Sequence, residues 1–116
     1  LSDTIIIFNH RANQIEFYKA PETIAKTVKI EFQNSKKWKK EIIRDEDTEE
    51  FYTLYDTRWG YQITKLNVQT GQSIDLIELD RAFISNVKIK GGYLYFLQSD
   101  FNGKDQISKL QKMRID

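Results

Sequence analysis

The sequence predicts an all-β fold of short antiparallel strands. Runs rich in Ile, Val, Thr, Tyr and Phe alternate between apolar and polar residues, and only one proline and five glycines interrupt the chain. The clearest alternation lies in residues 51–71, where two strand-like runs are joined by a short loop at residues 56–60 and followed by a Thr-Gly turn. The apolar residues that alternate there are Tyr52, Leu54, Ile63, Leu66 and Val68.

The same alternation locates the other strands. They are expected at residues 4–8, 14–19, 24–32, 41–44, 73–79, 84–89, 93–98 and 106–114. The connections between them have turn chemistry. Pro21 offers no N–H to a strand ladder, the acidic run 45–50 joins two strands, and Gly71 can take a left-handed conformation.

A helical interpretation is open for two segments, residues 23–29 and 105–113. In the second segment Ile107, Leu110 and Met113 fall at helical spacing. The strand interpretation predicts instead that the apolar positions of the strands are buried between neighbouring sheets. The side chains expected to be buried in this way are Tyr52, Leu54, Ile63, Leu79, Val87, Leu94 and Leu97.

The composition limits the class of protein. The chain has 116 residues, of which 40% are hydrophobic and 13% aromatic, enough for one packed domain over residues 1–116. Lys and Arg number 18 against 17 Asp and Glu, so no net field recruits nucleic acid. No apolar run approaches the roughly 20 residues that span a bilayer. The absence of cysteine excludes disulfides and thiolate metal sites.

A repeat divides the chain into three segments. The tetrapeptides that begin at Ile15, Ile63 and Ile107 are 48 and 44 residues apart, and each follows an apolar strand and a polar loop. A period of about 40 to 50 residues with four strands per unit is typical of β-propeller blades. We therefore expect antiparallel four-stranded β-propeller-like blades in an incomplete propeller. The blade fragments are expected at residues 1–33, 34–80 and 81–116.

The sequence of these strands resembles one known family. The runs FYTLY and YLYFLQ and the segments ITKLNVQTGQ and ISNVKIKGGYLYF are similar to those of six-bladed β-propeller proteins that Bacteroides-like gut bacteria make in quantity. The resemblance covers most of the chain from Trp38 onward. It implies a bacterial protein, periplasmic or extracellular as many of these proteins are. It implies a fold and not a chemistry, because propellers host binding modules, lyases and scaffolds alike.

No motif indicates catalysis, metal binding or a cofactor. His10 is the only histidine, so a three-histidine or mixed zinc site cannot be built, and we expect His10 to be a solvated loop residue. Asp45, Asp47 and Glu49 alternate as calcium ligands do, but Glu50 stands where such a loop needs glycine. Neither a nucleophile elbow nor a glycine-rich phosphate loop is present. We therefore expect no metal and no cofactor.

One edge of the strands is expected to carry a recognition surface. Because strand direction alternates, the loops fall into two sets, one basic and aromatic and the other acidic. Arginine donates paired hydrogen bonds to carboxylates and sulfates, and tryptophan offers a flat apolar surface to sugar rings. The candidate ligand-binding residues are His10, Arg11, Trp38, Arg58, Trp59, Arg81 and Phe101. In the alternative interpretation, both tryptophans are buried between blades, and the basic run 36–40 is a solvated connection.

Two functions are compatible with these features. The first is a non-catalytic binding or interaction module whose loops recognise a protein or an acidic glycan. The second is a fragment of a propeller-fold polysaccharide lyase or hydrolase whose catalytic residues lie on other blades. In both cases the strands at 4–8 and 106–114 are expected to have unpaired edges, which favour self-association or pairing with the remaining blades.

Overall fold

The fold consists of strands joined by short loops. A computed structural model describes residues 4–20, 23–58, 60–79, 84–102 and 105–115. The predicted all-β fold is confirmed, because this part of the chain contains strands and one 3-10 turn, η1 (Phe32–Asn34). The strands are β1 (Ile5–Asn9), β2 (Gln14–Ala20), β3 (Thr23–Lys29), β4 (Trp38–Asp45), β5 (Glu50–Asp56), β6 (Tyr61–Leu66), β7 (Ser73–Leu79), β8 (Ile84–Lys90), β9 (Tyr93–Asn102) and β10 (Asp105–Arg114).

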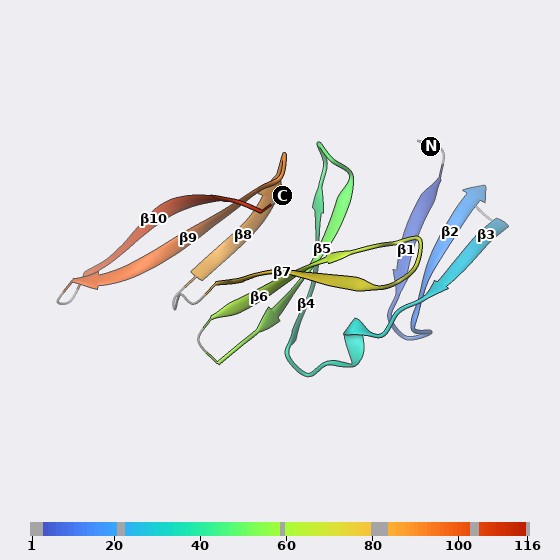
Figure 1. The fold of residues 1–116 in the computed structure, drawn as a ribbon, viewed down its shortest axis with the longest axis horizontal. Coiled ribbons are helices and arrows are strands. Elements are labelled where there is room, and N and C mark those ends of the chain that lie inside the picture. The colour runs from blue at the N-terminus through green and yellow to red at the C-terminus, as the bar shows by residue number, and fades with distance from the viewer. Residues whose placement is uncertain (1–3, 21–22, 59, 80–83, 103–104, 116) are drawn as a thin grey trace.

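The strands form three antiparallel sheets. The first sheet has the order β1-β2-β3, the central sheet β4-β5-β6-β7 and the third sheet β10-β9-β8. The sheets lie side by side along the longest axis of a molecule that measures 57 × 29 × 23 Å (Figure 1). Each strand pairs with its neighbour in sequence, so short hairpin turns suffice as connections within a sheet.

Both segments with an alternative helical interpretation are strands. Residues 23–29 form β3, and residues 105–114 form β10. The helical spacing of Leu110 and Met113 is outweighed by pairing along the whole length of β9, because every residue of β10 has a cross-strand partner there.

Three strand boundaries differ from the prediction by three residues or more. β9 continues to Asn102 instead of ending at residue 98. β3 ends at Lys29, before Phe32, because Phe32 enters η1 and buries its ring. β4 begins at Trp38, inside the expected polar connection. A β-bulge follows Trp38, with Lys40 in a left-handed conformation at a φ of 59°. The bulge allows part of the basic run to belong to a strand, which its composition does not reveal.

The apolar core lies in two layers, one on each face of the central sheet. One layer joins the central sheet to the third sheet, and Leu54, Ile63 and Leu79 in it are at most 2% exposed. The other layer joins the central sheet to the first sheet and contains the fully buried Ile15 and Ile30. The central sheet is thus covered on both faces, whereas each outer sheet is covered on one.

This layering explains which burial predictions are confirmed. The predicted side chains that are buried are Tyr52, Leu54, Ile63, Leu79, Val87 and Leu94. The prediction for Leu97 is wrong, since its side chain is only partly buried. Leu97 follows the fully buried Phe96 on β9 and therefore points to the opposite face of the third sheet, away from the central sheet.

A buried carboxylate links the turns of neighbouring sheets. Asp45 ends β4 and is completely buried. Its carboxylate accepts hydrogen bonds from the backbone N–H groups of Asp47 (3.0 Å) and Thr48 (3.3 Å) in its own turn. It also accepts hydrogen bonds from the N–H groups of Gly91 (2.9 Å) and Gly92 (2.8 Å) between β8 and β9. A single side chain therefore ties the central sheet to the third sheet.

The backbone of the receiving turn favours glycine. Gly91 and Gly92 have φ values of 62° and 80°, in the left-handed region that other residues adopt at a cost. Burial alone would raise the pKa of Asp45, but the four backbone N–H groups outweigh burial and hold the pKa at about 2. The folded protein therefore stabilises the charged carboxylate.

We expect Leu54→Ala to destabilise the protein by roughly 2 to 5 kcal/mol, because truncation leaves a cavity between the central and third sheets. Urea unfolding followed by circular dichroism measures this change. Ile74→Ala is the matched control, since Ile74 is 63% exposed and its truncation should change stability by less than about 0.5 kcal/mol. An unchanged unfolding midpoint for Leu54→Ala would exclude Leu54 from the core.

We expect Asp45→Asn to lower the free energy of unfolding at neutral pH by about 1.5 to 3 kcal/mol, because the amide cannot replace a charged acceptor of four N–H groups. The pKa of about 2 in the fold lies below the ordinary 3.8. The contribution of Asp45 is therefore complete above about pH 4 and is lost as the pH falls toward 2.

Unfolding curves between neutral pH and about pH 2 test both parts of this expectation. The stability difference between wild type and Asp45→Asn should shrink in acid. The matched control is Asp47→Asn, which removes an exposed carboxylate from the same turn. If Asp47→Asn and Asp45→Asn had equal effects, the link between the turns would not depend on the Asp45 carboxylate.

Candidate functional site at the loop edge

The described connections lie along two opposite edges of the sheets. The β1–β2 loop, the η1 segment and the β5–β6 loop lie along one edge, which we call the loop edge (Figure 1, lower side). The turns after β4 and β8 lie along the opposite edge (Figure 1). Segments that are far apart in sequence thus come together at the loop edge.

An aromatic cluster joins the first sheet to the central sheet at the loop edge. The centroid of the His10 ring lies 4.8 Å from that of Trp38 and 5.8 Å from that of Phe32. The rings of Phe8 and His10 are stacked at 6.4 Å with an interplanar angle of 14°. Phe32 and Trp38 meet edge to face at 5.1 Å. The cluster therefore brings together the end of β1, η1 and the start of β4.

Trp38 packs between sheets instead of extending from a solvated connection. Its ring is partly buried against the core layer between the first and central sheets. Its indole Nε1 donates a hydrogen bond to the carbonyl oxygen of Glu41 at 3.2 Å. The aromatic signal in the basic run thus reflects packing, as the alternative interpretation predicts for this tryptophan.

His10 lies in an apolar environment, so the expectation of a solvated loop residue is wrong. The ring is partly buried, and no described group lies within hydrogen-bonding distance of its buried Nδ1. Burial lowers the pKa of His10 from the usual 6.5, because it removes water from the charged form. His10 therefore packs as a neutral ring in the aromatic cluster.

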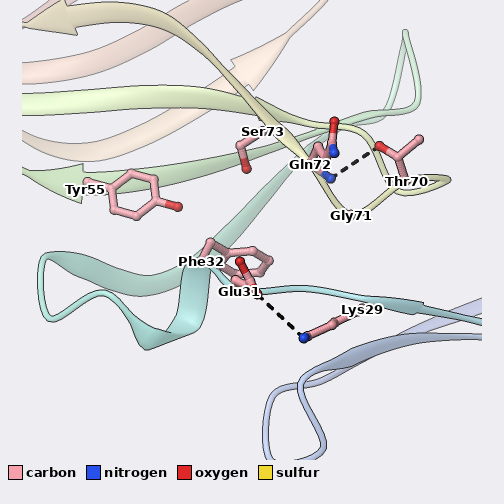
Figure 2. A pocket seen from close by; sticks show the side chains of 8 residues that line it. All are labelled: Lys29, Glu31, Phe32, Tyr55, Thr70, Gly71, Gln72 and Ser73. Atoms are coloured by element: carbon pink, nitrogen blue, oxygen red, sulfur yellow. Dashed lines mark hydrogen bonds and ion pairs between the residues drawn. The ribbon is translucent and has the colours of Figure 1, made fainter.

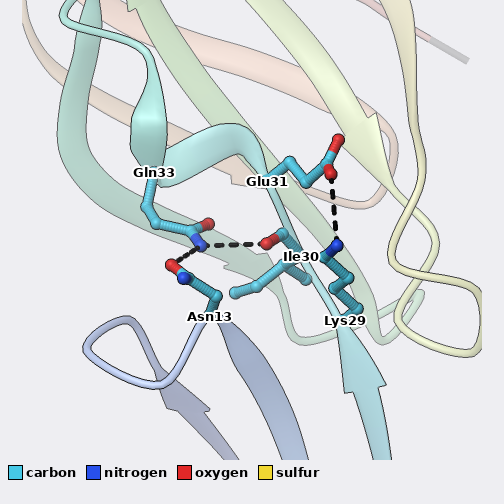
Figure 3. Close-up of polar contacts among 5 residues, drawn as sticks. All are labelled: Asn13, Lys29, Ile30, Glu31 and Gln33. Carbon is cyan, nitrogen blue, oxygen red and sulfur yellow. Dashed lines mark hydrogen bonds and ion pairs between the residues drawn. The ribbon is translucent and has the colours of Figure 1, made fainter.

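Hydrogen bonds fix the β1–β2 loop beside this cluster. Gln33 Nε2 donates to Asn13 Oδ1 (2.7 Å) and to the carbonyl oxygen of Ile30 (2.9 Å) (Figure 3). The N–H of Ile30 donates to the carbonyl oxygen of Asn13 at 3.0 Å. Asn13 has a φ of 57°, a left-handed conformation that asparagine tolerates well. The loop is thereby held against the segment that leaves β3.

A cavity of about 640 Å³ lies between the first and central sheets (Figure 2). It is lined by Lys29, Glu31, Phe32, Tyr55, Thr70, Gly71, Gln72 and Ser73. Lys29 and Glu31 form an exposed ion pair at 3.7 Å on the side of the first sheet. The turn between β6 and β7 forms the other side (Figure 2). A Cβ at Gly71 would lie 2.0 Å from the carbonyl oxygen of Lys29, so this approach requires glycine.

Sequence reasoning missed this cavity because its lining comes from three separate segments. The predicted left-handed conformation of Gly71 is confirmed by a φ of 76°. The close approach of Gly71 to Lys29 has no sequence signal, since it depends on how the two sheets pack. The cavity is open and mostly polar, and the described residues give it no convergent set of catalytic groups.

The structure brings together part of the predicted ligand-binding set. His10 and Trp38 are in ring contact, and Arg11 and Arg58 are exposed on the β1–β2 and β5–β6 loops of the same loop edge. Trp59 and Arg81 lie outside the described residues. Phe101 belongs to β9, but its side chain also lies outside the description. Two of the predicted arginines, Arg11 and Arg58, thus lie on the same edge as a packed aromatic cluster.

Comparison of the chain with protein-family models, with curated proteins and with solved structures finds no match. Within the described ranges, no group of three or more His, Cys, Asp or Glu side chains is arranged to hold a metal ion. None of the helical structure described for the chain is long and apolar enough to cross a membrane.

We expect His10→Phe to keep the aromatic cluster and to remove a pH dependence of stability. As the pH falls below 6.5, the unfolded chain binds the proton of His10 before the folded chain does, so wild-type stability decreases. Urea unfolding at about pH 7.5 and about pH 5.5 measures the difference between wild type and variant. Because His10 is the only histidine, parallel pH profiles would show that its imidazole is solvated after all.

Proposed function

We propose that the chain is a non-catalytic binding module of β-propeller architecture that recognises acidic glycans through its loop edge. The observation that carries the proposal is the presence of exposed Arg11 and Arg58 on the edge that also holds the packed rings of His10 and Trp38. Export to the periplasm or the cell exterior of a bacterium belongs to the same proposal and rests on the family resemblance.

Strand pairing supports equivalent blades. In the central sheet Tyr52 lies opposite Lys65, and Leu54 lies opposite Ile63. In the third sheet the corresponding pairs are formed by Tyr95 with Lys112 and by Leu97 with Leu110. The first sheet repeats the second of these pairs with Phe8 opposite Ile15. The three sheets therefore share the apolar pair across these two strands, and the central and third sheets also share the Tyr–Lys pair.

This pairing revises the predicted alignment of the repeat. The sequence match aligns Ile63 with Ile107, but Ile107 lies opposite Asp100 and not opposite Leu97. Pairing makes Leu110 the counterpart of Ile63, three residues further along the chain. The Ile-x-x-Leu similarity between the segments that begin at Ile63 and Ile107 therefore does not mark equivalent positions. Equivalent positions are those with corresponding cross-strand partners.

A shared irregularity also supports equivalent blades. The first strand of the central sheet has Lys40 at a φ of 59°, and the first strand of the third sheet has Asn86 at a φ of 54°. Both residues lie where the pairing shifts, at a β-bulge. A left-handed bulge in the same strand of two sheets is expected if both sheets are copies of one blade.

The loop edge favours an acidic ligand over a neutral one. Guanidinium groups bind carboxylate and sulfate oxygens through paired hydrogen bonds. Arg11 and Arg58 come from loops of different sheets, so a ligand that bridges both must extend along the edge. An extended polyanionic chain such as an acidic glycan satisfies this requirement.

A propeller-fold polysaccharide lyase or hydrolase, of which this chain would be a fragment, is the alternative. Glycan cleavage needs a positioned acid or base at the substrate. In the described part of the loop edge, the imidazole of His10 lies among the rings of Phe8, Phe32 and Trp38. This environment suits packing better than proton transfer, and it favours binding over catalysis.

We expect the double variant Arg11→Ala with Arg58→Ala to bind polygalacturonate and dextran sulfate roughly tenfold more weakly than wild type, because two charged donors are lost. Binding is measured by calorimetry at low and at physiological salt, with neutral dextran as the reference ligand. The thermal melt of the variant should stay unchanged, since both side chains are exposed.

The matched control is Lys19→Ala with Lys109→Ala, which removes two exposed cations from strands. It should bind as wild type does. Equal weakening in both double variants would show unspecific attraction by charge and would contradict a site at the loop edge. New reducing ends in the glycan after incubation would instead support the enzyme alternative.

A further inference from the structure

In the part of the chain that the structure describes, one face of the third sheet packs on the central sheet and the other face packs on no sheet. On β9, Leu94 and Phe96 are completely buried against the central sheet. Tyr95 and Leu97 alternate with them and therefore point away from the central sheet. Leu110, opposite Leu97 on β10, is 67% exposed. We call this uncovered surface, with Tyr95, Leu97 and Leu110, the tail face.

The tail face corresponds to a surface that is buried elsewhere in the same chain. Leu110 is the counterpart of Ile63 by strand pairing. Ile63 is completely buried because the third sheet covers it. The same position is thus fully buried in the central sheet and mostly exposed in the third sheet. The difference is the presence or absence of a covering sheet.

Among the described residues, the first sheet likewise packs on the central sheet with one face and leaves the other face without a covering sheet. On β1, Ile6 and Phe8 pack toward the central sheet. Ile5 and Ile7 alternate with them and are 55% and 45% exposed. Tyr18 lies opposite Ile5 on β2 and shares its face. We call this surface, with Ile5, Ile7 and Tyr18, the head face.

The head face is equivalent to the face of the third sheet that covers the central sheet. Leu94, which covers the central sheet, lies opposite Met113. Ile5 holds the same place in the first sheet, opposite Tyr18. The head face therefore presents apolar side chains at the positions from which the third sheet buries the central sheet.

We propose that the tail face of one copy of this chain docks on the head face of a second copy, in the arrangement that joins consecutive sheets within the chain. Ile5, Ile7 and Tyr18 of one copy then cover the tail face of the other. Three sheets from each copy make six, and two identical head-to-tail contacts close them into a ring. These faces use residues other than those of the loop edge.

Charge disfavours the other way of pairing two copies. Lys88 and Lys112 lie opposite Tyr95 and Lys90 lies opposite Tyr93, so all three lysines are on the tail face. Two tail faces in contact would bring these lysines together and repel each other. The head face instead carries Glu16, opposite Ile7, whose buried carboxylate accepts hydrogen bonds from Asn9, Gln14 and Tyr18. Head-to-tail contact therefore places lysines against an apolar surface with a carboxylate.

The test is the mass of the protein in solution, by size-exclusion chromatography with light scattering over a wide concentration range. We expect twice the 13.8 kDa of a single chain at high concentration. Leu110→Glu and Ile7→Lys should each weaken the dimer at least about tenfold, because each places a charge in an apolar contact. Both substituted side chains are exposed in the single chain, and circular dichroism confirms that each variant folds.

Mixing the two variants tests the head-to-tail geometry directly. A mixed dimer contains one wild-type contact and one contact in which Glu faces Lys, so an equimolar mixture should recover the dimer that neither variant forms alone. Ile74→Glu is the control, because Ile74 is equally apolar and 63% exposed on β7, and it should leave the dimer intact.

Several outcomes would overturn the proposal. If the chain stays monomeric at every concentration, no second copy covers its head and tail faces. A dimer that survives Ile7→Lys but not Leu110→Glu is joined tail to tail. A mass that grows beyond two copies indicates open chains and not a closed ring, and a mixture that stays monomeric excludes the complementary contact.

Discussion

The structure depends on one constraint, which is that a sheet with apolar side chains on both faces needs a cover on both. The central sheet satisfies it within the chain, and Ile63 is completely buried as a result. The outer sheets satisfy it on one face each, and Leu110 remains 67% exposed. Leu110 is the counterpart of Ile63 by strand pairing and is also apolar, so the difference in exposure comes from the covering sheet.

Apolar contact alone does not fix how two sheets lie against each other, because the hydrophobic effect has no direction. At each interface between two sheets in this chain, the contacts of one turn fix how the sheets lie against each other. Between the central and third sheets, the Asp45 carboxylate accepts N–H groups from Gly91 and Gly92. Between the first and central sheets, Gly71 lies directly against the carbonyl oxygen of Lys29. Both contacts depend on glycine. Gly91 and Gly92 donate their N–H groups from a left-handed turn, and Gly71 leaves room for the carbonyl oxygen of Lys29.

Alternation of apolar residues predicts the strands of this fold, because each strand contributes side chains to two faces. It does not predict the environment of His10 or Trp38, since a run of lysines around a tryptophan looks solvated while a β-bulge and η1 turn the ring inward. It also misaligns the repeat at Ile107, because register depends on cross-strand partners. The cavity beside Gly71 arises from sheet packing and leaves no local signal.

The geometry of the fold links the two proposals, ligand binding at the loop edge and head-to-tail association of two copies. Within the chain, the β1–β2 loop, η1 and the β5–β6 loop share one edge because consecutive sheets run in the same sense (Figure 1). Head-to-tail docking repeats that relation, so the loop edges of two copies would lie on the same side of the ring. An extended polyanion could then contact Arg11 and Arg58 of both copies, and the second contact would be intramolecular. Once the polyanion is bound to one copy, the second loop edge would meet it at a high effective concentration. Association through the head and tail faces would therefore strengthen binding at the loop edge, although these faces do not touch the ligand.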